Sequence, residues 1–306
     1  MKRSLVVAGV ALVALSGGLV GAEELGKDGA GGETAAAETA PRTAKKTAIR
    51  WGIDKAPAKH RVHPQLPGWP AAGILIDLNT GQVMWSYRAD TRRPIASLTK
   101  MMNALVVTKR PILNKTIQIS SGAANMGGSV VGGLAVGSRI KVRDLLKGML
   151  IVSGNDAATA LAQGVGHGRF VAAMNRKAKA MGLKCTRFET PTGLSDGDRS
   201  CARDLAFIGK AVIANPDLRK IVHTSWTRMP IGNGRTAGLW NRNPLMRSHF
   251  SGITGIKTGH TNAAGYGLVA TAKRGNRRLL AVMLAEDEQG HEMAALLNQG
   301  FAALRR

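Results

Sequence analysis

The sequence has few aromatic and few acidic residues, and it shows no motif for a metal or a cofactor. Phe, Trp and Tyr make up 4% of its 306 residues, and 19 Asp and Glu stand against 43 Lys and Arg. A basic chain with so few aromatic residues and no recognised nucleic-acid motif is not expected to bind nucleic acid. Its seven histidines lack metal-ligand spacing, and no Gly-rich phosphate loop, HExxH motif or calcium-binding loop is present. We therefore expect neither a metal nor a cofactor.

No apolar run is long enough to span a membrane, and the run at residues 5–20 has the form of a secretory signal. Lys2 and Arg3 precede this run, and small residues follow it up to Ala22. This order of charged, apolar and small residues is typical of a cleaved signal peptide, which we predict over residues 1–22. The protein is therefore expected in the periplasm or outside the cell, without a stable membrane anchor.

Only two cysteines are present, Cys185 and Cys201. An oxidising compartment allows them to form a disulfide. Two buried free thiols are equally compatible with the sequence, because the geometry that decides between the two states is not visible in the residue order.

Residues 23–60 consist largely of Ala, Thr, Gly and charged residues without apolar periodicity, which is typical of a disordered linker.

Six acidic and six basic residues cancel between positions 23 and 55. Subtracting the charges of Lys2 and Arg3 from the net charge of +24 therefore leaves +22 on residues 56–306. This excess favours an anionic partner, and for an exported protein an anionic cell-wall polymer fits better than nucleic acid. A purely solubilising role of the charge is the alternative.

The order of the predicted elements indicates a mixed α/β (α+β) domain over residues 61–306. Two strand-like runs flank Asn79-Thr80-Gly81 and predict a hairpin. Helical periodicity dominates residues 101–245, and three further strand-like runs and a last helix follow. The terminal strands can pair with the first hairpin. We predict one antiparallel sheet flanked by helices, with residues 101–245 inserted as an all-helical subdomain.

Three short motifs occur in a fixed order along this domain. They are Ser97-Leu98-Thr99-Lys100, Ser153-Gly154-Asn155 and Lys257-Thr258-Gly259. A lone Ser-x-x-Lys usually means a helix cap and a lysine that faces solvent. All three motifs together, at a helix start, a helix junction and a strand, indicate a serine acyl-transfer site.

The chemistry of acyl transfer explains these residue types. Ser97 needs a base to become a nucleophile, and Lys100 can serve only if its pKa falls by about 3 units. We expect burial and a second cation, Lys257, to lower that pKa. Ser153 is then placed to relay the proton to the leaving group, and Asn155 to hold the substrate peptide. On the third motif, an extended substrate can pair with the strand, and the glycine permits close approach.

At these motifs the chain resembles the low-molecular-mass penicillin-binding proteins, the serine D-alanyl-D-alanine carboxypeptidase/endopeptidase family. The stretches "VSGNDAATALA", "TRFETPTGLSDGD" and "GIKTGHTNAAGYGLVATAKR" extend the resemblance over residues 65–306. It implies a serine β-lactamase/DD-peptidase-like fold with the site in a cleft. It assigns the acyl-ester nucleophile to Ser97, its base to Lys100, and the second side of the site to Ser153 and Asn155. Substrate contacts fall to Lys257, Thr258, Gly259 and His260, with the backbone N–H groups of Ser97 and His260 as the oxyanion hole.

Within this resemblance, several alternatives differ in activity. Class A β-lactamases carry an E-x-x-L-N loop that is missing after Glu189, so we expect slow deacylation of penicillin. The chain ends after the last helix of the catalytic fold, which favours the soluble endopeptidase subgroup over carboxypeptidases. We expect a monomer that acts on peptidoglycan stem peptides and is inhibited covalently by β-lactams. A non-hydrolytic penicillin-binding sensor or wall-binding protein is the alternative from another class, and a serine β-lactamase is a further one.

Overall fold

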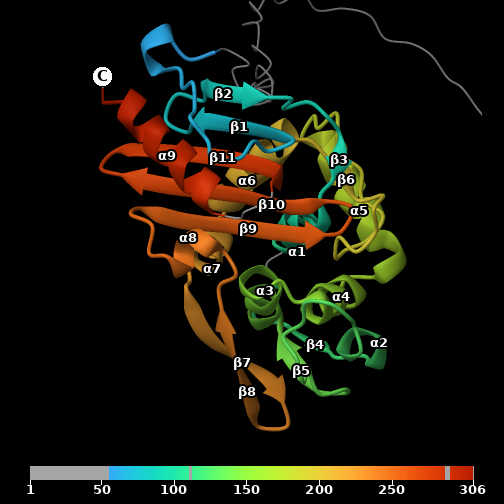
Figure 1. Cartoon of the computed structure of the whole chain (residues 1–306). Coiled ribbons are helices and arrows are strands. Elements are labelled where there is room, and N and C mark those ends of the chain that lie inside the picture. The colour runs from blue at the N-terminus through green and yellow to red at the C-terminus, as the bar shows by residue number, and fades with distance from the viewer. Residues whose placement is uncertain (1–54, 110–111, 287–289, 306) are drawn as a thin grey trace, which may run out of the picture. The chain divides into compact units, whose positions relative to one another are not determined.

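The computed structural model describes residues 55–109, 112–286 and 290–305 (Figure 1). The predicted signal peptide and most of the predicted linker lie outside the described residues. The domain begins earlier than the expected boundary at residue 61. Lys55 forms a bridge with Val83, Ala56 is 1% exposed, and Ala58–His60 form the short 3-10 helix η1.

One five-stranded antiparallel sheet forms the upper half of the domain in Figure 1. Its strands are β1 (Ala72–Asp77), β2 (Val83–Tyr87), β9 (Ile253–Thr261), β10 (Gly265–Arg274) and β11 (Arg277–Glu286). The spatial order is β2-β1-β11-β10-β9, and Ile74 of β1 pairs with Val282 of β11. The predicted hairpin and its pairing with the terminal strands are therefore confirmed. Strand β9, which carries the third motif, lies at one edge of this sheet.

Alternate residues of β11 enter two separate cores, because successive side chains of a strand point to opposite faces. Leu280 and Val282 pack in the core shared with α1 (Lys100–Val107) and α6 (Ala202–Ala214). Ala281 and Met283 pack instead against α9 (His291–Ala303), which crosses the other face of the sheet (Figure 1). Burying both faces fixes the strand register, since a slip by one residue would exchange the two faces.

The inserted block is mainly helical, but it is not all-helical. Its other helices are α2 (Ser121–Ala124), α3 (Val142–Ile151), α4 (Asn155–Gly164), α5 (His167–Ala180), α7 (Pro216–Val222) and α8 (Pro244–Arg247). Three two-stranded ribbons join it: β3 (Arg93–Pro94) with β6 (Arg199–Ser200), β4 (Thr116–Gln118) with β5 (Arg139–Lys141), and β7 (Trp226–Gly232) with β8 (Arg235–Trp240). The last ribbon turns at Asn233-Gly234, whose φ angles of 52° and 72° suit a hairpin turn. Among the described residues, no helix is both long and apolar enough to cross a membrane.

The two cysteines form a disulfide, which settles the question that the sequence left open. Cys185 and Cys201 are joined with a Cα–Cα distance of 5.6 Å, and they close a segment of the chain between α5 and α6. This segment passes close to the chain just before α1, because a Cβ on its Gly193 would lie 1.9 Å from the Ala96 carbonyl oxygen.

Candidate active site

A cleft of about 940 Å³ brings the three motifs together. Its walls include Ser97 from the 3-10 turn before α1, Ser153 from the junction of α3 and α4, and Thr258 and Gly259 from β9. The Gly-rich segment at residues 125–137 borders the cleft through Ser129, Val130 and Val131. Three segments that are far apart in the sequence therefore converge on one space.

Ser97 lies on the 3-10 helix η2 (Ala96–Thr99), directly before α1, so Lys100 follows it by one turn. Lys100 is 0% exposed, and its Nζ lies 2.7 Å from Ser97 Oγ, from Asn155 Oδ1 and from the Thr192 carbonyl oxygen. A neutral amine donates two hydrogen bonds and accepts one. Asn155 Oδ1 and the Thr192 carbonyl can only accept, so the neutral amine accepts its hydrogen bond from the Ser97 hydroxyl. This is the geometry of a general base for Ser97.

Burial lowers the pKa of Lys100 to about 7, because the charged amine loses its hydration. The Arg242 cation also lowers this pKa, whereas the carboxylates of Asp198 and Asp156 raise it. Arg242 is therefore a cation that lowers the pKa of Lys100 and that the sequence did not indicate. The expected lowering by Lys257 stays a prediction. Burial, then Lys100 and then Arg242 lower the pKa of Lys257 well below its ordinary value.

Ser153 and Lys257 form a second Ser–Lys pair across the cleft. Lys257 is 2% exposed and donates hydrogen bonds of 2.8 Å to Ser153 Oγ and to the Thr258 carbonyl. Ser153 has a φ of 64°, in the left-handed region that a residue with a side chain rarely adopts. The turn between α3 and α4 therefore holds the Ser153 hydroxyl at a fixed place, which suits a proton relay.

Asn155 is held by the protein at both ends of its side-chain amide. Its Oδ1 accepts from Lys100, and its Nδ2 donates to the Gly127 carbonyl at 2.8 Å. Asn155 is 2% exposed at the start of α4. It therefore positions Lys100 and the Gly-rich segment, while a contact with the substrate stays a prediction.

Gly259 lets η2 pack closely against β9. A Cβ atom at this position would lie 2.9 Å from the Ile95 carbonyl oxygen and 3.1 Å from the Leu98 backbone nitrogen. The glycine is thus required because the backbone of residues 95–98 lies so close to it. The close approach of a substrate to Gly259, which we expected from the sequence, stays a prediction. The neighbouring His260 is exposed, and its ring stacks on Tyr266 with centroids 4.1 Å apart.

A third support of the site, the segment closed by the disulfide, is not apparent from the residue order. Thr192 supplies a carbonyl acceptor to Lys100, and a Cβ on Gly193 would lie 1.9 Å from the Ala96 carbonyl oxygen. Asp198 is 0% exposed, and its carboxylate accepts from the Thr190 hydroxyl and backbone N–H. The run of Thr, Pro, Gly, Ser and Asp in this segment indicates turns, but it does not identify what the turns contact.

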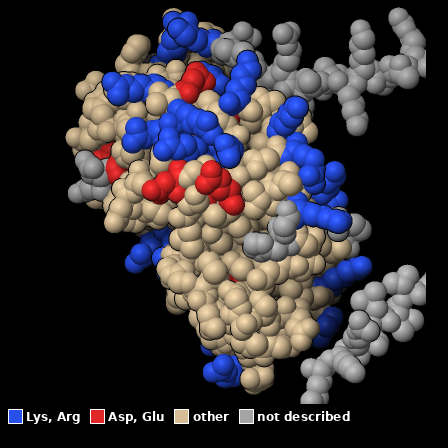
Figure 2. Space-filling view, turned by 90° about the vertical axis from the view of Figure 1, so that its right-hand side faces the viewer, with Lys and Arg blue, Asp and Glu red and all other residues tan. Residues whose placement is uncertain are grey.

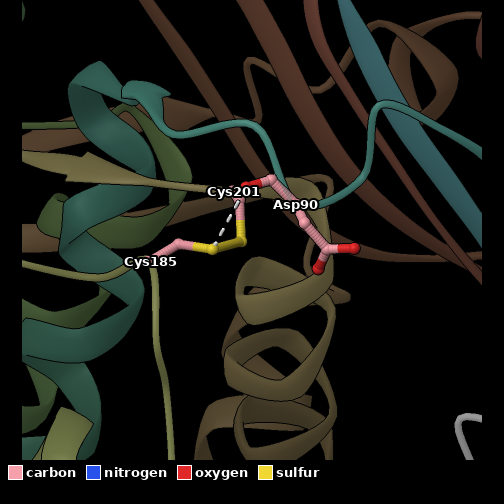
Figure 3. Close-up of side chains that lie close together, drawn as sticks. All are labelled: Asp90, Cys185 and Cys201. Carbon is pink, nitrogen blue, oxygen red and sulfur yellow. Dashed lines mark hydrogen bonds between the residues drawn. A yellow bond between two sulfur atoms is a disulfide. The ribbon is translucent and has the colours of Figure 1, made fainter.

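Asp90, Cys185 and Cys201 lie within 4.8 Å of one another, a spacing that suits a metal site (Figure 3). Both sulfur atoms are in the disulfide, so neither is available as a thiolate ligand. The Asp90 carboxylate points away from them in Figure 3 and binds Arg203 at 2.6 and 2.9 Å. These residues are therefore structural, and they do not form a metal centre.

Comparison with known proteins supports the family that the three motifs suggest. A family model described as D-alanyl-D-alanine carboxypeptidase matches residues 67–288. D-alanyl-D-alanine carboxypeptidase DacF of Bacillus subtilis is 34% identical over 242 residues, which cover 76% of this chain and 62% of DacF. The chain spans less than two thirds of the length of the first curated relatives it matches.

Solved structures agree in fold. The D-alanyl-D-alanine carboxypeptidase of Mycobacterium tuberculosis H37Rv has a TM-score of 0.73 at 34% identity, covering 79% of this chain and 96% of that one. The Streptomyces K15 DD-transpeptidase has a TM-score of 0.72 at 30% identity, with 78% and 99% covered. The mixed α/β fold of the penicillin-binding proteins and the resemblance to this family are thus confirmed. This chain belongs to the D-alanyl-D-alanine carboxypeptidase family of serine peptidases.

Proposed function

We propose that the protein is a serine DD-peptidase that hydrolyses D-alanyl peptide bonds of peptidoglycan through an acyl-enzyme on Ser97. The observation that carries this proposal is the buried amine of Lys100, 2.7 Å from Ser97 Oγ in a cleft that holds all three motifs. A lysine whose pKa is lowered to about 7 is half neutral near neutral pH, so it can take the proton of a serine.

In the acylation step, Ser97 Oγ attacks the carbonyl carbon of the D-alanyl bond while its proton moves to Lys100 Nζ. The negative charge that develops on the carbonyl oxygen is stabilised by the backbone N–H groups of Ser97 and His260. The C–N bond then breaks, and the leaving amine takes a proton from the Ser153 hydroxyl, which the Lys257 amine orients. Ser153 regains this proton from the Lys100 ammonium, so both residues return to their neutral forms. The product is an ester on Ser97 and a free amine.

In the deacylation step, water attacks the ester carbon while its proton moves to Lys100. The ester C–O bond then breaks, Ser97 Oγ takes this proton back, and the shortened peptide leaves as a carboxylic acid. Glu189 is unsuited to activate this water, because its carboxylate accepts a hydrogen bond from Ser195 at 2.8 Å and lies 3.8 Å from Arg187. This supports slow release of a bound penicillin, as the missing E-x-x-L-N loop suggests. An amine acceptor in place of water would give a transpeptidase, the activity named for the Streptomyces K15 protein.

We infer that the substrate is the cross-linked wall, met in the periplasm or outside the cell, and that endopeptidase action on cross-links is preferred. The net charge of +22 on residues 56–306 supports this, because a basic surface concentrates on an anionic polymer. On the face drawn in Figure 2, Lys and Arg side chains predominate over Asp and Glu. Strand β9 lies at the sheet edge along the cleft, which suits pairing with an extended stem peptide.

Labelling with penicillin tests the acyl-enzyme. Mass spectrometry should place one adduct on the peptide that contains Ser97, and Ser97→Ala should abolish it. An adduct that survives this substitution would refute the assignment. Rapid release of opened penicillin would indicate a β-lactamase, and labelling without turnover of any muropeptide would indicate a sensor.

Purified muropeptides test the substrate. Monomers released from cross-linked dimers support the endopeptidase, whereas free D-alanine alone supports the carboxypeptidase. Salt should slow turnover of intact peptidoglycan but not of a short neutral D-Ala-D-Ala peptide, because ions screen long-range attraction. Equal responses of the two substrates would show that the basic surface plays no part in substrate capture.

A further inference from the structure

Two tryptophans with exposed indole rings form a pair on the β7–β8 hairpin, and one of them, Trp240, lines the cleft. Trp226 on β7 and Trp240 on β8 are directly opposite each other, with ring centroids 5.8 Å apart. They are 43% and 70% exposed. The chain has only five tryptophans, and exposing so much apolar area to water is unfavourable unless the surface binds a partner.

The hairpin itself arranges these rings as one surface. Side chains alternate between the two faces of β7 and β8. One face is buried and carries Met229, Ile231 and Leu239. The other face is exposed and carries Trp226, Arg228 and Trp240. Gly238 is opposite Arg228, and a Cβ on it would lie 3.7 Å from Trp226 Nε1. The Trp226 indole therefore extends over the bare backbone of Gly238. The Arg228 guanidinium lies 5.7 Å from the centre of the same ring.

This surface, which we call the tryptophan platform (Trp226, Arg228, Gly238 and Trp240), is continuous with the catalytic cleft. Gly238 and Trp240 line the cleft that contains Ser97 and Thr258. A polymer whose reacting bond reaches Ser97 thus passes next to the platform. Because the cleft is shared, the partner of the platform is expected to be covalently part of the substrate.

We propose that the tryptophan platform binds the glycan strand of peptidoglycan while the attached stem peptide occupies the cleft. The proposal rests on the proposed function, which supplies the peptide. A sugar ring has apolar C–H faces and a rim of hydroxyl and amide groups. Indole rings match the faces, and Trp226 Nε1 and the Arg228 guanidinium offer donors to the rim. Tryptophan and arginine also suit a membrane surface, but continuity with the cleft favours the polymer over a lipid.

Binding to glycan strands stripped of their stem peptides tests the platform without any catalytic step. The double variant Trp226→Ala with Trp240→Ala should bind this glycan at least about ten-fold more weakly than the wild type, the loss typical of aromatic anchor residues. Trp69→Ala is the matched control, because Trp69 is 56% exposed but lines a separate hollow beside β2. It should bind like the wild type. A double variant with Phe at both platform positions should retain most of the affinity, since it keeps the aromatic faces and the fold.

Unchanged glycan binding by the double alanine variant would overturn the proposal. The proposal would also fail if this variant lost affinity for vesicles of anionic phospholipid but still bound glycan like the wild type. The platform would then be a membrane contact. Penicillin labelling of the wild type tests the proposed activity independently of glycan binding. If Ser97 is not labelled while the platform variants still lose glycan binding, the proposed activity fails and the platform stands.

Discussion

The carbonyl oxygen of Thr192 accepts a hydrogen bond from Lys100 Nζ at 2.7 Å, although the two residues are 92 positions apart. Thr192 is 3% exposed and belongs to the segment that the Cys185–Cys201 disulfide closes. Asp198, in the same segment, accepts backbone hydrogen bonds from positions 189 and 190 at 2.7 and 3.0 Å. The disulfide therefore constrains a segment that supplies one of the hydrogen-bond acceptors of the Lys100 amine.

Removing the disulfide should weaken both the fold and the site. Cys185→Ala with Cys201→Ala releases a loop of 16 positions, and chain entropy gives a loss of about 3 kcal/mol in the free energy of unfolding. Acylation by penicillin should also slow, because the Thr192 carbonyl is held less firmly. Urea unfolding and stopped-flow acylation measure the two effects. A reductant should reproduce them in the wild type and leave the variant unchanged; wild-type stability in the variant would contradict this account.

Gly193→Ala should reduce acylation far more than an ordinary glycine substitution. Its Cβ would lie 1.9 Å from the Ala96 carbonyl oxygen, so the residue before Ser97 must move. Gly193 also has a φ of 85°, which strains any residue with a side chain. Gly182→Ala is the matched control, because its φ is 73° and a Cβ there meets no atom within 4 Å. We expect Gly182→Ala to lose only about 1 kcal/mol of stability, with normal acylation. Equal acylation rates in both variants would show that the contact with Ala96 is unimportant.

The sequence predicted the parts of the site that depend on local spacing. Ser97 and Lys100 are one helical turn apart, so their contact follows from the helix alone. The apolar run at residues 279–285 likewise predicted a strand, and the order of the elements predicted that the terminal strands pair with the first hairpin.

Long-range contacts were not visible in the residue order. Thr192 meets Lys100 through its backbone carbonyl, a group that every residue has, so no residue type marks the contact. Arg242 affects the pKa of both lysines only because the chain beyond β8 returns to the cleft. The β7–β8 hairpin had a usable signal in Asn233-Gly234, but it lies inside the block of residues 101–245 that we predicted to be helical.

Lys100→Arg should lower the rate of penicillin acylation by about 10²–10⁴-fold, the usual contribution of a general base. The guanidinium stays protonated, so it cannot accept the Ser97 proton. In the wild type, protonation of Lys100 blocks the base, so the rate should rise with pH and level off above about 7. Stopped-flow acylation from pH 5 to 9 measures the profile. A flat profile, or a near-normal rate in the arginine variant, would rule out Lys100 as the base.

Glu286 should make the protein less stable as the pH rises. It is 3% exposed at the end of β11, and neither carboxyl oxygen has a hydrogen-bond partner among the described residues. Burial, and then the nearby Glu292, raise its pKa from 4.5 to about 8. The folded protein thus keeps this proton at pH values where the unfolded chain has lost it. The resulting contribution to the free energy of unfolding is full below about 4.5 and is lost as the pH rises through about 8.

Glu286→Gln tests this directly, because the amide stays neutral at every pH and has nearly the same shape. The variant should be more stable than the wild type at pH 8.5, by several kcal/mol at most, and the difference should shrink toward pH 4.5. Urea unfolding at intervals of one pH unit measures it. Asp196→Asn changes an exposed carboxyl and controls for the loss of one negative charge from the surface. A constant difference between Glu286→Gln and the wild type across this range would mean that Glu286 ionises equally in both states, and its burial would then carry no pH dependence.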